Sequence, residues 1–293
     1  MPSLDELIGE AQKSPTGIID LRRHEYIGKL AEKRDRNVIC YYSGWLQKND
    51  QSRADDISDL DTEGFMANIH GLDKSKGLDL VLHTPGGQLS AVEQLVKYLK
   101  SWFNNDIVAF VPQLAMSAGT MMACACKEIY MGKQSAIGPT DPQFGGIPAG
   151  GIEREFEQAV KETTKNPSSS AMWAQIISKY TPTLLGECRN AVQASTEMVK
   201  DWLSDNMLKD DEQTADHAAR WLGTHENSAM HDRHINIDQA REIGLKVIPL
   251  EEDNELQDIV LTIHHAYMLS FERSNARKMI ENSEGKSWII QQG

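Results

Sequence analysis

Two short motifs contain residue types that together could carry out acyl transfer. The first is Pro85-Gly86-Gly87, and the second contains Ser117 followed by Ala118. A serine at the start of a helix lies beside first-turn amides that lack intrahelical partners, where the helix dipole favours negative charge. A glycine turn lets another backbone amide approach a substrate carbonyl because no Cβ intervenes. The motifs therefore indicate a Ser117 nucleophile, with the amides of Gly87 and Ala118 as an oxyanion hole.

Each motif also has a structural interpretation. A serine before a helix is often an N-cap, and Pro-Gly-Gly is often only a turn. The elbow of α/β-hydrolases is excluded, because Ala115 stands where its first glycine would be. The order and shared topology of the two motifs favour the catalytic interpretation.

The elements around the motifs repeat one pattern, a short apolar strand followed by a helix. The predicted strands are residues 37–42, 78–83, 107–112 and 128–131. Helical crossovers between consecutive strands are typical of a parallel sheet with right-handed connections. Functional loops of such sheets lie at the carboxyl ends of the strands. Both motifs occupy that position.

The rest of the chain is predicted to be mainly helical. A first helix spans residues 4–36, with a break at Pro15-Thr16-Gly17. Further helices are expected at 152–164, 172–180 and 184–208, and a short helix runs into a strand over 236–247. We expect a last helix over 259–279 and a loose tail after Glu281.

Composition limits the classes of function. The 293 residues are 40% hydrophobic and 25% charged, as in an ordinary globular protein. A formal net charge of -13 without a basic stripe argues against nucleic acid binding. No apolar run approaches the roughly 18 residues of a membrane span, and acidic residues near the start are unlike a secretory signal. We therefore expect a cytoplasmic protein with no integral membrane segment.

Metal and cofactor sites are not expected. The four cysteines lack paired spacing, which favours buried free thiols. The histidines between His217 and His234 have no carboxylate or thiol partner at zinc-ligand spacing, so we predict an exposed polar loop there. His83 is predicted to pack locally. Asp141 lies between prolines, and we expect it to hold its loop through an Asx turn.

Three segments in order resemble a known superfamily. Residues 83–87 (HTPGG), 115–120 (AMSAGT) and 137–143 (IGPTDPQ) are similar to the Clp protease/crotonase superfamily. The chain more narrowly resembles the serine dehydrogenase proteinase family, relatives of signal peptide peptidase A. The likeness covers about residues 38–143, and again 235–247. It implies an α/β spiral of β-β-α units with a parallel sheet, Ser117 as nucleophile, the Gly87 and Ala118 amides as oxyanion hole, and a homo-oligomer.

The sequence differs from Clp-type proteases in the residue that could act as general base. Clp-type proteases place a histidine in the loop after the fourth strand, but residues 138–141 contain none. Relatives of signal peptide peptidase A use a downstream lysine, which implies Lys165, with Lys161 one turn earlier as the alternative. A lysine acts as a base only where burial lowers its pKa well below about 10.4.

The sequence therefore predicts a cytoplasmic serine peptidase that cleaves peptide or protein substrates through an acyl-enzyme on Ser117. We expect a helical extension over 1–36, a peptidase core over 37–250, and a C-terminal helix and tail over 251–293. No cofactor is required. Two alternatives stay open. The first is a catalytically silent binding or assembly module with the same fold. The second, a crotonase-like acyl-CoA enzyme, is disfavoured because no basic adenine-phosphate pocket is evident.

Overall fold

The computed structural model describes residues 7–9, 17–48, 52, 54–223 and 233–292. Within them, seven strands form the main sheet in the order β11-β10-β1-β2-β3-β5-β9. Strands β1, β2, β3, β5 and β9 are parallel to one another, whereas β10 is antiparallel to both β1 and β11. The bounds are β1 Asn37–Ser43, β2 Leu78–His83, β3 Ile107–Val111, β5 Ile129–Met131, β9 Val247–Pro249, β10 Ala276–Asn282 and β11 Ser287–Gln291. The predicted α/β class with a largely parallel sheet is confirmed.

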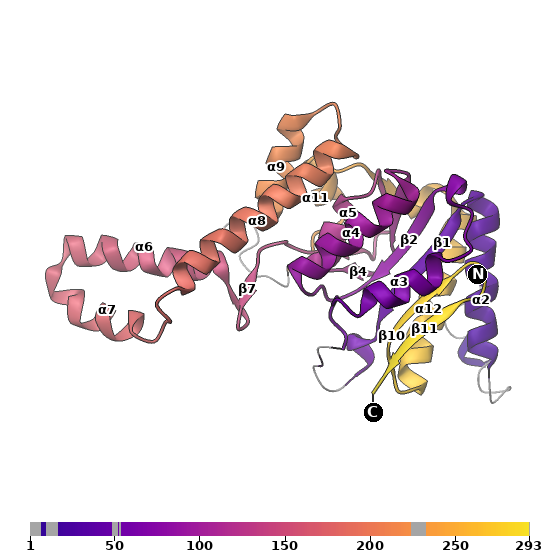
Figure 1. Ribbon diagram of the computed structural model, residues 1–293, viewed down its shortest axis with the longest axis horizontal. Helices are drawn as coiled ribbons and strands as arrows, with labels where there is room; N and C mark the ends of the chain where they lie inside the picture. The colour runs from indigo at the N-terminus through magenta and orange to yellow at the C-terminus, as the bar shows by residue number, and fades with distance from the viewer. Residues whose placement is uncertain (1–6, 10–16, 49–51, 53, 224–232, 293) are drawn as a thin grey trace.

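Helices cover both faces of the sheet (Figure 1). One face packs against α3, α4 and α5, and the other against α2 and α12. The bounds are α2 Ile18–Arg34, α3 Asp61–Ile69, α4 Leu89–Phe103, α5 Ala118–Cys124 and α12 Asn254–Arg273. Side chains along β2 alternate between the two faces of the sheet. Leu80 and Leu82 lie in the core beneath α3, α4 and α5, and Val81 lies in the core beneath α2 and α12.

Helices α6 and α7 project away from this body, and the long helix α8 returns the chain to it (Figure 1). A small apolar cluster between α6 and α8, including Ile152 and Cys188, holds the projecting part together. The bounds are α6 Ala149–Lys165, α7 Ser170–Ile177, α8 Leu184–Asp205, α9 Glu212–Gly223 and α11 Ile237–Glu242. Two short pairs complete the described strands, β4 Leu114–Ala115 with β6 Ala136–Ile137, and β7 Gln143–Phe144 with β8 Ile147–Pro148.

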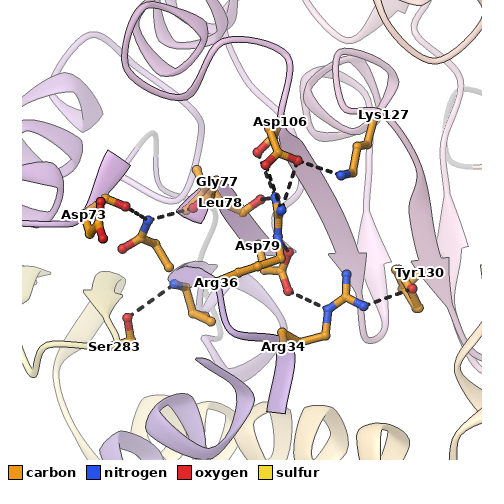
Figure 2. Close-up of polar contacts among 12 residues, drawn as sticks. Arg34, Arg36, Asp73, Gly77, Leu78, Asp79, Asp106, Lys127, Tyr130 and Ser283 are labelled. Carbon is orange, nitrogen blue, oxygen red and sulfur yellow. Dashed lines mark hydrogen bonds and ion pairs between the residues drawn. The ribbon is translucent and has the colours of Figure 1, made fainter. Parts of the chain in front are cut away.

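An ion-pair network fixes the amino-terminal edge of the parallel strands (Figure 2). The buried carboxylate of Asp79 accepts hydrogen bonds from Arg34 (2.9 Å) and Arg36 (2.6 Å). Arg36 also makes two bonds of 2.9 Å to Asp106, which pairs with Lys127 at 2.6 Å. The network ties the end of α2 to the start of β2. It lies at the edge opposite the glycine turn.

The C-terminal prediction is wrong. Helix α12 ends at Arg273, and the chain then forms the β10–β11 hairpin where we expected helix and a loose tail. Gly64 of α3 permits this hairpin to pack closely, since a Cβ there would lie 2.5 Å from Ile280 and 2.7 Å from Trp288.

The other helix predictions differ from the structure mainly at their ends. Of the two pieces expected over residues 4–36, the second is α2, which begins at Ile18 after Gly17 with a φ of +87°, and residues 7–9 of the first are also helical. Pro15 and Thr16 lie outside the described residues. Two of the histidines expected in an exposed loop fall within the described chain. His217 lies in α9, which contradicts the loop, and His234 lies exposed just before α11.

Candidate active site

A cleft of about 700 Å³ opens at the carboxyl ends of the parallel strands, where functional loops were expected. Its described lining comes from five regions, namely Asp56, the glycine turn with the start of α4, the start of α5, the loop after β6, and one side of α8. The lining includes Asp56, Gly86, Gly87, Ser117, Ala118, Met121, Thr140, Asp141, Phe144, Ala191 and Ser195. The two predicted motifs therefore share one cavity.

Ser117 has a backbone conformation that few residues adopt. Its φ is 50° and its ψ is -115°, between β4 and the first residue of α5. The other non-glycine residues with positive φ in the described chain are Asp35 and Asn104, types that tolerate this region and that end helices here. A serine in such a conformation costs on the order of 1–3 kcal/mol. Its side chain makes no capping hydrogen bond, so the N-cap interpretation is wrong.

Backbone hydrogen bonds hold the two motifs together. The Thr84 amide donates to the Leu114 carbonyl, and the Met116 amide donates to the Thr84 carbonyl, both at 3.0 Å. These bonds extend the pairing of β2 with β4, so the glycine turn lies directly beside Ser117. The Thr84 hydroxyl also accepts a hydrogen bond from the Gly86 amide at 3.1 Å. The pairing of these segments explains why the motifs occur in this order.

Gly86 packs directly against the serine. Its φ is +104°, and a Cβ there would lie 2.7 Å from the Ser117 Cβ and 3.1 Å from the Ala118 amide nitrogen. Glycine is therefore required both by conformation and by space. The turn places backbone, rather than a side chain, against Ser117.

Gly87 pairs with a segment that sequence reasoning did not identify. The Ile57 amide donates to the Gly86 carbonyl at 2.7 Å, and the Gln88 amide donates to the Ile57 carbonyl at 2.9 Å. This bridge uses groups on either side of Gly87, so the Gly87 amide takes no part in it. The amides of Gly87 and Ala118 both belong to residues that line the cleft.

The loop after β6 closes another wall. The Gly138 amide donates to the Thr120 hydroxyl at 2.9 Å, which ties the loop to α5. Thr140 is held by the Leu222 carbonyl (2.9 Å) and by the Ser195 hydroxyl (2.8 Å), which come from α9 and α8. Asp141 is buried and lines the cleft beside them.

The predicted base does not meet Ser117 within one chain. Lys165 and Lys161 are exposed in the last turns of α6 and are not among the described lining residues. Helix α6 begins beside the cleft, where the Ala149 amide donates to the Pro142 carbonyl at 2.9 Å. Its 17 residues then carry Lys165 about 25 Å away, into the projecting part of Figure 1. No lysine or histidine appears among the described residues that line the cleft.

The histidine beside the glycine turn is structural, as predicted. His83 is fully buried on the α12 face of β2, where its ring stacks on Trp45 and lies edge-on to His264. Burial, with His264 as a lesser cause, lowers the pKa of His83 well below its usual value. The imidazole is therefore neutral and packed on the sheet.

A buried lysine near the cleft gave no signal in the sequence. Lys278 lies in β10, and its ammonium group donates to the Asp56 carbonyl at 2.6 Å and to the Asp61 carboxylate at 2.7 Å. Burial lowers the pKa of Lys278, and the Asp61 carboxylate opposes that change. These contacts occupy its ammonium group, so Lys278 supports the segment at Asp56 that lines the cleft.

Among the described residues, no group of three or more histidine, cysteine, aspartate or glutamate side chains is arranged to hold a metal ion. The four cysteines are free and buried, as predicted. None of the described helices is both long and apolar enough to span a membrane.

Comparison with known proteins identifies a family and individual proteins that are similar to this chain. The family model for ClpP-like SDH-type serine proteinases matches residues 16–262. The uncharacterized protein MJ0137 of Methanocaldococcus jannaschii is 32% identical over 209 residues, which cover 71% of this chain and 64% of that protein. MJ1495 of the same organism is 28% identical over 187 residues, or 64% of this chain and 57% of that protein. The chain thus spans less than two thirds of the length of either relative.

Two solved structures are also similar, both of variants of the 1510-N membrane-bound stomatin-specific protease. One is 16% identical with a TM-score of 0.41, covering 70% of this chain and 79% of that one. The other, in complex with a substrate peptide, is 15% identical with a TM-score of 0.42, covering 80% and 83%. With the family model matching most of its length, the chain belongs to the ClpP-like SDH-type serine proteinase family.

Proposed function

We propose that the protein is a cytoplasmic serine peptidase with a Clp/crotonase-like spiral core over residues 37–250. Ser117 is the nucleophile, and the amides of Gly87 and Ala118 form the oxyanion hole. The observation that carries this proposal is the strained backbone of Ser117, held against Gly86 in a cleft of about 700 Å³. Strain of this kind concentrates at sites where function depends on an exposed, oriented side chain.

The reaction follows from these positions. The Ser117 hydroxyl oxygen attacks the scissile carbonyl while a base accepts the hydroxyl proton. The carbonyl oxygen becomes negative and is stabilised by the Gly87 and Ala118 amides. When the tetrahedral intermediate collapses, the peptide C–N bond breaks and the amine leaves with a proton. Water then hydrolyses the ester and restores the hydroxyl.

We propose Lys165 as the base, reaching Ser117 from a second copy of the chain in a homo-oligomer. The projecting α6 in Figure 1 supports this, because it exposes Lys165 far from the cleft of its own chain. An interface between two copies would bury that ammonium group, and a lysine needs such burial to act as a general base. Lys161, one turn earlier, is the alternative within the same helix.

A second candidate function is a catalytically silent binding module. The absence of lysine and histidine from the described lining residues favours it. The cleft would then bind a peptide without cleaving it. The two functions differ in whether Ser117 is nucleophilic.

A fluorophosphonate probe tests this difference. The intact oligomer should be labelled covalently, and labelling should disappear in Ser117→Ala. Lys165→Ala should remove labelling, whereas Lys161→Ala should retain it. Mixing Ser117→Ala with Lys165→Ala should restore part of the labelling, because mixed oligomers combine the two intact groups. An unlabelled wild-type oligomer would reject the peptidase in favour of the binding module.

A further inference from the structure

Strand β10 carries two buried cations directed at the segment that braces the glycine turn. Arg277 and Lys278 are 1% and 0% exposed. Both reach residues 55–61, which precede them by more than 200 positions. Burial of a charge is costly unless it is paired and hydrogen-bonded, so these contacts are specific.

The contacts fix the backbone as well as the carboxylates. Arg277 makes a two-point pair with Asp55, with distances of 3.0 and 2.5 Å. Lys278 makes a 2.6 Å bond to the carbonyl of Asp56 and pairs with Asp61 at 2.7 and 3.0 Å. The hydrogen bond from Lys278 to the Asp56 carbonyl matters most for the position of the backbone, because Asp56 immediately precedes Ile57.

Ile57 in turn sets the position of the glycine turn. It bonds to the Gly86 carbonyl and the Gln88 amide, one on each side of Gly87. A Cβ at Gly87 would lie 2.3 Å from both the nitrogen and the oxygen of Ile57, so the two backbones are in direct contact. Any shift of Ile57 must therefore move the Gly87 amide.

We infer that Lys278 is a positioning residue for the oxyanion hole, acting through the Asp56 carbonyl and Ile57 on Gly87. The inference rests on the proposed function. Arg277 supports the same segment through Asp55. The family model ends at residue 262, so β10 lies outside the region that it matches. We call the contacts of Arg277 and Lys278 with residues 55–61 the brace; it is formed from the C-terminal hairpin.

The test must remove the brace without leaving a buried charge. Lys278→Met alone would leave the Asp61 carboxylate uncompensated, so we combine it with Asp61→Asn. The substituted amide oxygen can still accept the hydrogen bond that the Tyr41 hydroxyl gives to Asp61 at 2.8 Å. The double variant therefore lacks the bond to the Asp56 carbonyl while keeping the site neutral.

A matched control removes another buried ion pair from the same strand. Arg23 and Glu281 are 2% and 0% exposed, and their pair joins β10 to α2 without touching residues 55–57. Arg23→Met/Glu281→Gln thus perturbs the hairpin to a similar extent. Circular dichroism at the assay temperature should show that both double variants are folded.

The readout is the second-order rate constant for fluorophosphonate labelling of Ser117. Loss of one oxyanion donor typically lowers kcat by about 10²–10³, so its displacement should slow labelling at least about tenfold in Lys278→Met/Asp61→Asn. The control should stay within about twofold of wild type. Hydrogen exchange at the Ile57 and Gln88 amides should also be faster in the brace variant alone.

The outcomes separate the two hypotheses. Labelling of the brace variant at the wild-type rate, with Ser117→Ala unlabelled, overturns the role of Lys278 and leaves the peptidase standing. Equal slowing of the two double variants overturns it too, since the effect would then be general to the hairpin. An unlabelled wild-type protein rejects the proposed function itself.

Discussion

At the scale of single residues, Gly86 decides how closely the glycine turn can approach Ser117. Its positive φ and its contact with the Ser117 Cβ impose separate requirements, one on the backbone and one on space. A side chain at this position would push the turn and Ser117 apart. The residue is therefore a sensitive probe of the site.

We predict that Gly86→Ala lowers the rate of fluorophosphonate labelling by about 100-fold or more, as expected when an oxyanion donor is lost. Gly17→Ala is the control, because Gly17 also has a positive φ (+87°) but a Cβ there would meet no atom within 4 Å. It should keep wild-type labelling. Equal effects of the two substitutions would mean that backbone strain, and not contact with Ser117, is responsible.

At the scale of elements, the network in Figure 2 fixes the end of α2 on the sheet. Asp79 is fully buried, whereas the side chains of Lys127 and Asp106 are 40% and 44% exposed. The pairs of Asp79 thus have a buried carboxylate, whereas the pair of Asp106 with Lys127 is partly exposed to water. Removing one partner of a buried pair is far more costly than removing an exposed one, because the remaining charge stays out of water.

We predict that Arg36→Ala lowers the free energy of unfolding by about 3 kcal/mol, whereas Lys127→Ala changes it by at most about 1 kcal/mol. Urea denaturation at neutral pH measures both. Similar losses in the two variants would show that Asp79 is compensated by Arg34 alone.

At the scale of the whole molecule, the sheet separates two cores, and the one beneath α12 contains buried histidines. Burial, with a smaller effect of His265, lowers the pKa of His264 from 6.5 to about 3. The unfolded chain therefore binds a proton that the folded protein does not, at any pH between these values. The contribution of His264 to stability is full above about pH 6.5 and is lost progressively as the pH falls toward 3.

We predict that the wild-type protein loses about 2 kcal/mol more stability than His264→Phe between pH 7 and pH 5, at about 1.4 kcal/mol for each unit below 6.5. Urea denaturation of both proteins at each pH isolates this residue, because other titrating groups are common to the two. Parallel pH profiles would show that His264 is protonated in the folded state.

The repeating strand-helix units were predictable because their apolar residues recur with local periods. The same is true of the motifs at Gly87 and Ser117, which follow strands of that pattern. Strand β10 was not predictable, since the buried charges of Arg277, Lys278 and Glu281 are neutralised by partners more than 200 residues away. The position of the base could not be predicted either. The place of Lys165 in the sequence does not reveal that α6 projects away from the sheet and carries Lys165 with it.

The position of β10 along the chain also determines when the site can be completed. Asp55 leaves the ribosome 222 residues ahead of Arg277, and Ser117 and the glycine turn emerge in between. Ser117 is therefore present on every unfinished chain that has passed α5, but the strand that holds the glycine turn is not. If Lys278 positions the Gly87 amide as inferred, the proposed site is completed only after the C-terminal hairpin has been synthesised, so the order of synthesis itself would restrain an unfinished chain.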